Sequence, residues 1–252
     1  IPSILNNFRP SIRLINDQTI FCYPISTDAA QICVDVLKVP IEKIKIQSLG
    51  VDTDLFFPLD RESNYKKIEL RNKLNIPQEN LICIYTGRFS SDKSPQVLAD
   101  AIDILHNKGI TNVSGLFVGN GSVDEINYIK SKRGCIVHPF VLVSELPDFY
   151  RASDIGVWPR EESTSQLDAA ACGLPIIISD KVKVIERAEG NGLLFKEGNS
   201  GDLAEKILLL TNKKKREEYS RNGVLKVKNN YSWSAIADER LIDYYNSFNK
   251  FI

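Results

Sequence analysis

From residue 81 onward, short apolar runs rich in β-branched residues alternate with segments of helical periodicity. We expect strands at six of these runs: 81–86, 113–118, 135–138, 154–158, 175–179 and 193–195. The alternation predicts an α/β fold with a doubly wound parallel sheet that has helices on both faces. Such sheets bind ligands beyond the carboxyl ends of their strands, so we expect the functional residues there.

Helix signals stand between the predicted strands. Helices are expected at 124–132, 144–151 and 166–172, with others starting at Pro95 and after a cap at Ser200. The helix that Pro95 begins has an apolar face formed by Leu98, Ala101, Ile102 and Leu105. Residues 119–121 (Gly-Asn-Gly) are expected to form a tight turn after the second strand.

The composition excludes several classes of protein. The chain has 252 residues, of which 43% are hydrophobic and 25% are charged, which is typical of a globular protein. Lys and Arg number 32 and Asp and Glu number 32, so the neutral balance argues against a nucleic-acid partner. No apolar run reaches the length of a membrane-spanning helix, and no signal peptide opens the chain. These features favour a cytoplasmic location.

Cysteine and histidine positions give no support for a metal or disulfide framework. The five cysteines are scattered and none forms a CxxC pair, so we expect reduced thiols. His106 and His138 are far apart, and no zinc site follows from local spacing. No Walker loop and no Ser/His/Asp or Cys/His arrangement is apparent.

The two ends of the chain differ in character from its middle. Residues 17–50 predict a strand–helix–strand unit, with strands at 19–25 and 44–49 and a helix capped by Thr27 or Asp28. Residues 55–78 predict a connector and a short helix. The last predicted helix starts at Trp233 and has a broad aromatic face, which docks either on its own domain or on a domain outside this chain.

Gly87, Arg88 and Lys93 follow the first strand of the βα series. Glycine allows a ligand to approach the backbone closely, and the two cations could bind a phosphate. Taken alone, the segment is more typical of a turn with two solvated cations.

A polar loop at 159–168 leads into a helix of small residues. Its free N–H groups could bind an anion, and its acidic residues could bracket a polyol phosphate. The alternative is an ordinary capped helix with exposed acids. The basic run at 213–216 is typical of a solvated face, with contact to an anionic membrane surface as its alternative.

Seven segments together resemble glycosyltransferase family 4, a group of retaining enzymes with the GT-B fold. The resemblance covers residues 50–245, in the family's order: GVDTDLFFP (50–58), TGRFSSDKSPQVLADAIDIL (86–105), GLFVGNGS (115–122), FVLVSELPDFYRASDIGVWP (140–159), DAAACGLPIII (168–178), GNGLLF (190–195) and YSWSAIADERLIDYY (231–245). It implies two Rossmann-like domains with the active site between them. Residues 1–50 would be the tail of the acceptor-side domain, 51–232 the nucleotide-sugar-binding domain, and 233–252 a crossover helix.

The resemblance also implies roles for individual residues. Arg88 and Lys93 match the pair that neutralises the donor diphosphate, so no metal is required, in agreement with the absence of a DxD motif. Donor-binding roles fall on eight further positions: Gly87, Gly119, Phe140, Val141, Ser163, Thr164, Ser165 and Asp168. Phe140 and Val141 match positions that meet the base. Asp168 matches the acid that holds the ribose, and Glu162 matches the acid that faces the transferred sugar.

The two acids depart from the family's E-x7-E pattern. The second is Asp rather than Glu, and five residues rather than seven separate Glu162 from Asp168. If this loop is truly two residues shorter than the family's pattern, Glu162 would lie several ångströms from the position of the family's first acid. Because the chain contains no methionine, an alternative is that two methionines of this loop were left out of the written sequence. A measured mass would reveal them.

The implied function is transfer of a sugar, with retention of configuration, from a nucleotide-sugar donor to a saccharide or lipid-linked acceptor. Surface polysaccharide or glycoconjugate synthesis is the implied process, either in the cytoplasm or peripherally at the inner membrane face. This chain alone is expected to bind the donor without turnover. Two alternatives stay open: a nucleotide-sugar epimerase of the same architecture, and a non-catalytic scaffold.

Overall fold

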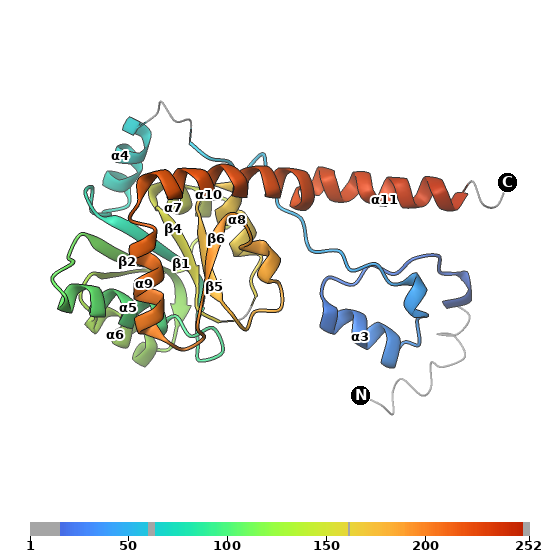
Figure 1. Ribbon diagram of the computed structural model, residues 1–252, viewed down its shortest axis with the longest axis horizontal. Coiled ribbons are helices and arrows are strands. Elements are labelled where there is room, and N and C mark those ends of the chain that lie inside the picture. Colours follow the sequence, from blue (N-terminus) through green and yellow to red (C-terminus); the bar gives the residue numbers. More distant parts are fainter. Residues whose placement is uncertain (1–15, 60–63, 161, 249–252) are drawn as a thin grey trace. The chain divides into compact units, whose positions relative to one another are not determined.

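The computed structural model describes residues 16–59, 64–160 and 162–248. The chain divides into two compact units, shown in Figure 1. The larger unit is Val51–Asn230, and the smaller combines Ile1–Gly50 with Tyr231–Ile252. Each unit is described by itself below.

The larger unit is built on one parallel sheet of six strands. The strands are β1 (Leu81–Phe89), β2 (Val113–Gly121), β3 (Cys135–His138), β4 (Ile155–Trp158), β5 (Ile176–Ser179) and β6 (Gly192–Phe195). Their order is β3-β2-β1-β4-β5-β6. The chain therefore winds outward from β1 in one direction and then returns to β4 and winds in the other. This arrangement confirms the predicted doubly wound, Rossmann-like sheet, whose switch point lies between β1 and β4.

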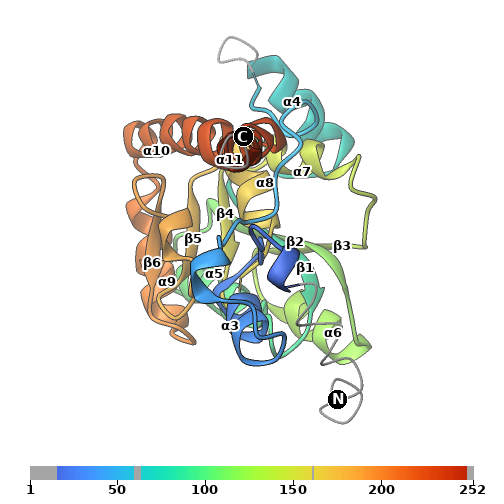
Figure 2. The same cartoon turned by 90° about the vertical axis from the view of Figure 1, so that its right-hand side faces the viewer.

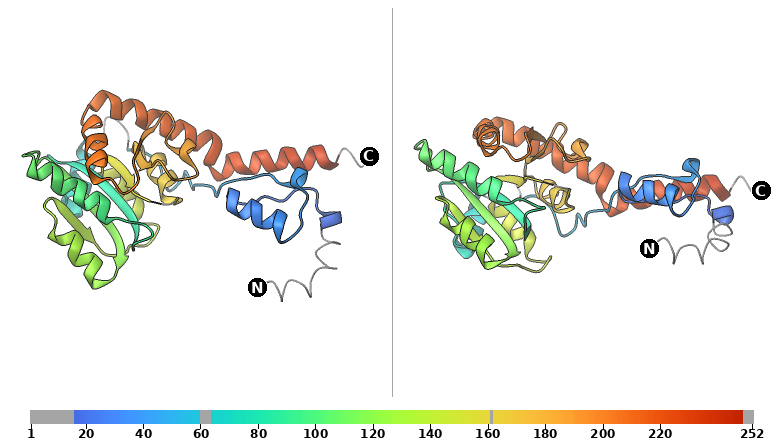
Figure 3. Two further views of the ribbon diagram at one scale, coloured as in Figure 1. Left: turned by 60° about the horizontal axis from the view of Figure 1, so that its bottom comes forward. Right: turned by 90° about the horizontal axis from the view of Figure 1, so that it is seen from below.

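Helices cover both faces of this sheet, as Figures 2 and 3 show. One group packs along β2, β3 and β6 and comprises α5 (Gln96–Asn107), α6 (Val123–Ser131) and α9 (Ser200–Leu209). The other group comprises α7 (Leu146–Ala152), α8 (Ser165–Ala171) and α10 (Lys213–Lys226), with α4 (Asn64–Lys73) against α7. A short 3-10 turn at Ile185–Arg187 precedes β6, and a π-helical turn at Val227–Tyr231 follows α10.

The apolar periodicity identified the core correctly. All four residues of the predicted face of α5 are fully buried: Leu98, Ala101, Ile102 and Leu105. Ile82, Ile84 and Phe117 from the central strands are also fully buried. Burial of each such large apolar side chain stabilises the fold by about 2 kcal/mol. The parallel sheet needs these continuous apolar strands because helices cover it on both sides.

Several local predictions were wrong at element ends. The Gly-Asn-Gly segment is the last part of β2 rather than a turn, because Gly119 continues the parallel register opposite Gly87. Helix α9 is capped by the Asn199 side chain, which accepts from the Asp202 N–H, rather than by Ser200. Helix α7 begins at Leu146, two residues later than predicted.

The smaller unit lacks the two predicted strands. Segments 19–25 and 44–49 pair at a single bridge between Cys22 and Ile44, and among the described residues of this unit no further strand lies beside them. Helix α3 (Thr27–Asp35) is capped by Ser26 rather than by Thr27 or Asp28, since the Ser26 hydroxyl accepts from the Ala29 N–H. A pair of isolated segments gains too few ladder hydrogen bonds to extend into a sheet.

The last helix of the smaller unit, α11 (Trp233–Phe248), contacts the 21–50 segment mainly through polar groups. Tyr23 donates to Asp243 at 2.7 Å, and Gln47 donates to Glu239 at 3.0 Å. The Trp233 ring packs on Gly50, where a Cβ atom would come within 2.5 Å of it. The predicted aromatic face is otherwise largely exposed, with Tyr244 and Tyr245 at 56% and 70%.

Candidate functional site

The carboxyl ends of β1 and β2 form a floor of bare backbone. Gly87 pairs with Gly119, and both have positive φ angles, 147° and 155°, which favour glycine. A Cβ atom on Gly119 would lie only 1.9 Å from the Gly87 carbonyl oxygen. The two strands can therefore approach in this way only without side chains, and a ligand above them would meet peptide groups.

A cavity of about 260 Å³ opens on this floor, and we call it the carboxyl-edge cavity. Six of the predicted site residues line it: Gly87, Arg88, Gly119, Phe140, Val141 and Ser165. Thr86, Val118, Asn120 and Leu146 complete the lining. The structure thus brings residues from four separate chain segments to the edge where the fold predicts a ligand.

Arg88 and Lys93 give the region positive charge. Arg88 is exposed and forms a long ion pair with Asp92 at 3.7 Å. Lys93 does not line the cavity but lies in the turn after β1, where its N–H donates to the Ser90 carbonyl at 3.1 Å. The nearby Ser90 hydroxyl, and less strongly the charges of Arg88 and Lys93, hold the pKa of Asp92 below its usual range. Both cations therefore lie near one carboxylate.

Asp168 lies in the first turn of α8 and does not line the cavity. Burial raises the pKa of its carboxyl group to about 7. Near neutral pH the side chain is therefore divided between an ionised form, which only accepts hydrogen bonds, and a protonated form, which can also donate one.

Tyr150 supports the cavity wall through Thr86, and its position was not predicted from the sequence. It is fully buried, and its hydroxyl shares a 2.8 Å hydrogen bond with Thr86. Burial, with a smaller effect of the Asp168 charge, raises the pKa of Tyr150 above its usual value. The tyrosine stays neutral and ties α7 to the end of β1.

The loop that leads into α8 holds Glu162, Ser163 and Thr164, none of which lines the cavity. Glu162 is exposed, and its neighbour Glu161 lies outside the described residues. The Ser163 hydroxyl accepts from the Ser165 N–H at 3.3 Å. The structure therefore places the predicted sugar-facing acid beside the cavity's α8 wall without directing it into the cavity.

Arg187 anchors this loop and was also missed. Arg187 is 5% exposed, and its Nη1 donates to the Ser163 carbonyl at 3.1 Å and to Gln166 Oε1 at 3.3 Å. The sequence held no signal for it, because the segment 182–188 contains two further charged residues, Lys183 and Glu186, and is typical of a surface turn.

Neither a metal site nor a membrane-spanning helix is found among the described residues. No group of three or more His, Cys, Asp or Glu side chains could hold a metal ion. Within the same part of the chain, no helix is both long and apolar enough to cross a membrane.

Proteins with similar sequences are glycosyltransferases. Residues 80–213 match the family model described as "Glycosyl transferases group 1". The capsular polysaccharide biosynthesis glycosyltransferase CapM of Staphylococcus aureus is 28% identical over 218 residues, which cover 82% of this chain and 56% of that protein. The N,N'-diacetylbacillosaminyl-diphospho-undecaprenol alpha-1,3-N-acetylgalactosaminyltransferase of Campylobacter jejuni is 29% identical over 183 residues, or 70% and 47% of the two chains.

Solved structures show the same fold. A glycosyltransferase from Rickettsia africae has a TM-score of 0.75 at 20% identity, with 96% of this chain and 67% of that chain covered. Anabaena Alr3699/HepE, solved in complex with UDP and glucose, has a TM-score of 0.72 at 19% identity, with the same shares covered. This chain spans about half the length of the curated relatives it matches. Because the family model matches more than half of the residues, the chain belongs to the group 1 glycosyltransferases.

Proposed function

We propose that this chain supplies the donor-binding part of a retaining glycosyltransferase that takes its sugar from a nucleoside-diphosphate sugar. The carboxyl-edge cavity is the observation that carries the proposal. It combines a backbone floor, an exposed arginine and an aromatic side chain at the edge where doubly wound sheets bind nucleotides. Membership of the group 1 family supports the same chemistry.

In this mechanism Arg88 and Lys93 neutralise the diphosphate as it leaves the sugar. Fixed cations are effective here because negative charge develops on the leaving group, and they need no reorganisation. The pair lies within one turn of the chain, at the end of β1. We therefore propose that the transfer is independent of a metal ion.

Other residues would orient the donor. Phe140 and Val141 border the base, and the glycine floor admits the diphosphate at close range. Asp168 in its ionised form accepts hydrogen bonds from the ribose hydroxyls. The loop that Arg187 anchors offers the backbone N–H groups of Ser163 and Thr164 to the sugar, and Glu162 would turn toward it when the donor binds.

The names of relatives support an acceptor class. CapM is named for capsular polysaccharide biosynthesis, and the Campylobacter relative is named for a diphospho-undecaprenol acceptor. We propose a saccharide or lipid-linked acceptor in surface polysaccharide or glycoconjugate synthesis, on the cytoplasmic side of the membrane. The HepE complex with UDP makes UDP the first nucleotide to test.

A thermal-shift titration of this chain with UDP, GDP, ADP and their sugar conjugates tests the proposal. A ligand at a hundredfold excess over its Kd stabilises the native state by about 2.7 kcal/mol. One base should raise the melting temperature, and Arg88→Ala or Lys93→Ala should abolish the shift. Lys130→Ala, an exposed lysine on α6, should keep it. If no nucleotide produces a shift, the scaffold hypothesis replaces this proposal.

A further inference from the structure

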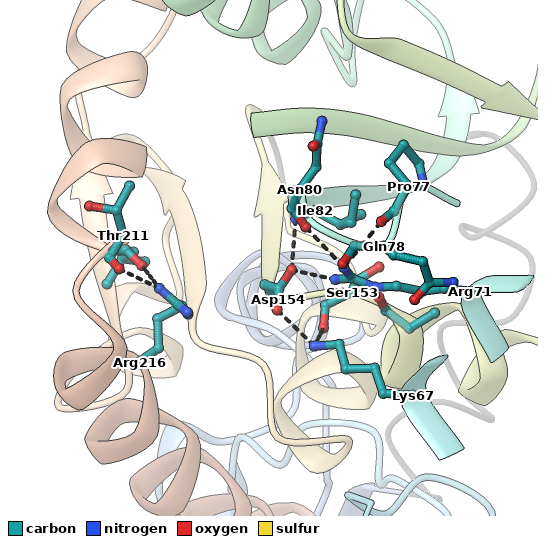
Figure 4. Close-up of polar contacts among 12 residues, drawn as sticks. Lys67, Arg71, Pro77, Gln78, Asn80, Ile82, Ser153, Asp154, Thr211 and Arg216 are labelled. Carbon is teal, nitrogen blue, oxygen red and sulfur yellow. Dashed lines mark hydrogen bonds and ion pairs between the residues drawn. The ribbon is translucent and has the colours of Figure 1, made fainter. Parts of the chain in front are cut away.

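A larger cavity lies at the amino ends of the strands, and we call it the amino-edge cavity. Its volume is about 630 Å³, which is within the usual range for sites that bind small molecules. Its walls come from α4, the starts of β1 and β2, the residue before β4 and the start of α10. Figure 4 shows Lys67, Arg71 and Asp154 on one side and Arg216 with Thr211 across from them. The proposed donor binding does not use this cavity.

Positive charge predominates in the lining. Four cationic and two acidic side chains leave a formal excess of two positive charges: Lys67, Arg71, Lys213 and Arg216 against Glu79 and Asp154. A cavity lined predominantly by one sign of charge concentrates ligands of the opposite sign.

The acid within the cavity is already neutralised. Asp154 accepts from Lys67 Nζ and from Arg71 Nη2, both at 2.7 Å, and from the Ile82 N–H at 2.7 Å. The remaining donors of Arg71 bind backbone carbonyl oxygens of Ala152, Pro77, Gln78 and Asn80. This network holds α4 against the sheet and leaves little net repulsion for an anion.

Arg216 on the facing wall has N–H donors that are available to a ligand. Its Nη1 donates to the carbonyl oxygens of Leu210 and Thr211 at 2.6 and 2.8 Å. Among the described residues, its Nε and Nη2 have no hydrogen-bond or carboxylate partner. Lys67 Nζ has two acceptors, Ser153 O and Asp154, and therefore one further N–H.

The first turn of α10 also favours an anion. It contains three lysines and Arg216 and no acidic residue. Cations at this positive end of the helix dipole are each unfavourable by about 0.3–1 kcal/mol, and an anion there is favourable by a similar amount. Lys213 and Arg216 are three residues apart, hence on one face, and both line the cavity, whereas Lys214 does not.

The pKa of Lys67 is lowered mainly by burial. Asp154 opposes this effect, and the charges of Arg71 and Arg216 lower the pKa by smaller amounts. The effect of Arg216 on Lys67 means that charge on one wall is felt at the other.

We propose that the amino-edge cavity binds a small phosphate-bearing anion between Arg216 and Lys213 on one wall and the free N–H of Lys67 on the other. A guanidinium fork, ammonium groups and a helix N-terminus together match the several oxygens of a phosphate. The volume exceeds that of inorganic phosphate, so an organic phosphate is the natural ligand class.

Calorimetry with inorganic pyrophosphate tests this site on the full chain carrying Arg88→Ala and Lys93→Ala, which remove the cations of the donor region. Adding Arg216→Gln should weaken binding about tenfold, and Lys213→Gln several-fold, by loss of charge-assisted hydrogen bonds. Lys214→Gln is the matched control and should change binding less than about twofold.

Because Lys213 is 82% exposed, its substitution should leave folding intact, and unchanged unfolding curves would establish this. No binding to the double variant, or an equal loss with Lys214→Gln, would overturn the proposal. Neither result depends on nucleotide binding at the carboxyl edge. A second arm uses phosphatidylglycerol vesicles with phosphatidylcholine blanks: retention that Arg216→Gln abolishes assigns the phosphate to a lipid headgroup, and no retention assigns it to a soluble compound.

Discussion

The two cavities at opposite edges of one sheet differ in their lining: one has a floor of backbone and the other has walls of charged side chains. The carboxyl-edge cavity has a floor of backbone at Gly87 and Gly119 and an exposed cation, Arg88. The amino-edge cavity is walled by charged side chains, of which buried Arg71 and half-buried Asp154 are bonded to several partners. Most charged groups at the amino edge therefore stabilise the fold, because they bind one another and the backbone. Substitution of Arg71 or Asp154 should therefore reduce stability, whereas charge substitutions at the carboxyl edge should reduce binding.

The largest effect is expected from Asp154→Ala. It leaves Lys67 and Arg71 without their carboxylate in a largely buried place, and breaking such a pair destabilises by about 3–5 kcal/mol. Urea unfolding followed by circular dichroism measures the loss. Asp148→Ala is the matched control, because Asp148 forms a comparable 2.9 Å pair with Lys73 on the exposed side of α4. Equal stability of the two variants would refute the contrast between the edges.

Gly119→Ala should have the next largest effect. The new methyl group would meet the Gly87 carbonyl, so β1 and β2 must separate, at a loss of about 2–3 kcal/mol and with loss of nucleotide binding. Gly109→Ala also places alanine at a positive φ, 81°, but in open space, and should lose only about 1 kcal/mol. If both variants unfold at the same urea concentration, the close approach of β1 and β2 does not contribute to the free energy of unfolding.

Arg187→Gln should affect the sugar more than the nucleotide. Without its hydrogen bond to Ser163, the loop before α8 loses its anchor, and affinity for the nucleotide sugar should fall about tenfold while affinity for the free nucleotide changes little. Calorimetry with both ligands measures the two affinities. Arg133→Gln, at an exposed arginine beside β3, is the control. A parallel loss of both affinities would indicate general unfolding instead.

Asp168 gives the smallest and most pH-dependent effect. Its pKa of about 7 lies above the ordinary value of 3.8, so the native state binds the proton more tightly than the unfolded chain. This stabilisation is present at low pH and is lost as the pH rises from about 4 to about 7. Nucleotide affinity should change in the opposite direction, increasing at most about tenfold between pH 6 and pH 8 as the carboxylate ionises. Asp168→Asn should remove both trends, and their persistence would contradict the assignment.

The sheet could be predicted because its signal is local. Buried parallel strands appear as continuous apolar runs, and the face of α5 follows from helical spacing alone. The end of β2 could not be predicted in this way, since Gly119 extends the strand only because Gly87 lies opposite. The prediction of two strands in the smaller unit was wrong for a related reason. Their residues are typical of strands, but strand formation depends on adjacent strands with which to pair.

The lining of the carboxyl-edge cavity could be predicted where glycines and a cation follow a strand directly. Arg187 and Tyr150 were missed because their partners, Ser163 and Thr86, are 24 and 64 residues away along the chain. The amino-edge cavity was missed for the same reason. Lys67 falls in a stretch that predicts only a connector and a short helix, and its partner Asp154 is 87 residues away.

The backbone floor of the carboxyl-edge cavity has an evolutionary consequence. Peptide groups at Gly87 and Gly119 offer the same donors and acceptors whatever the rest of the chain becomes, and substitution of either glycine is strained. This part of the surface can hardly diverge. Changes in donor preference among relatives should therefore accumulate in the side chains around it, above all at Phe140 and Leu146, whose replacement alters the shape of the cavity without disturbing the strands.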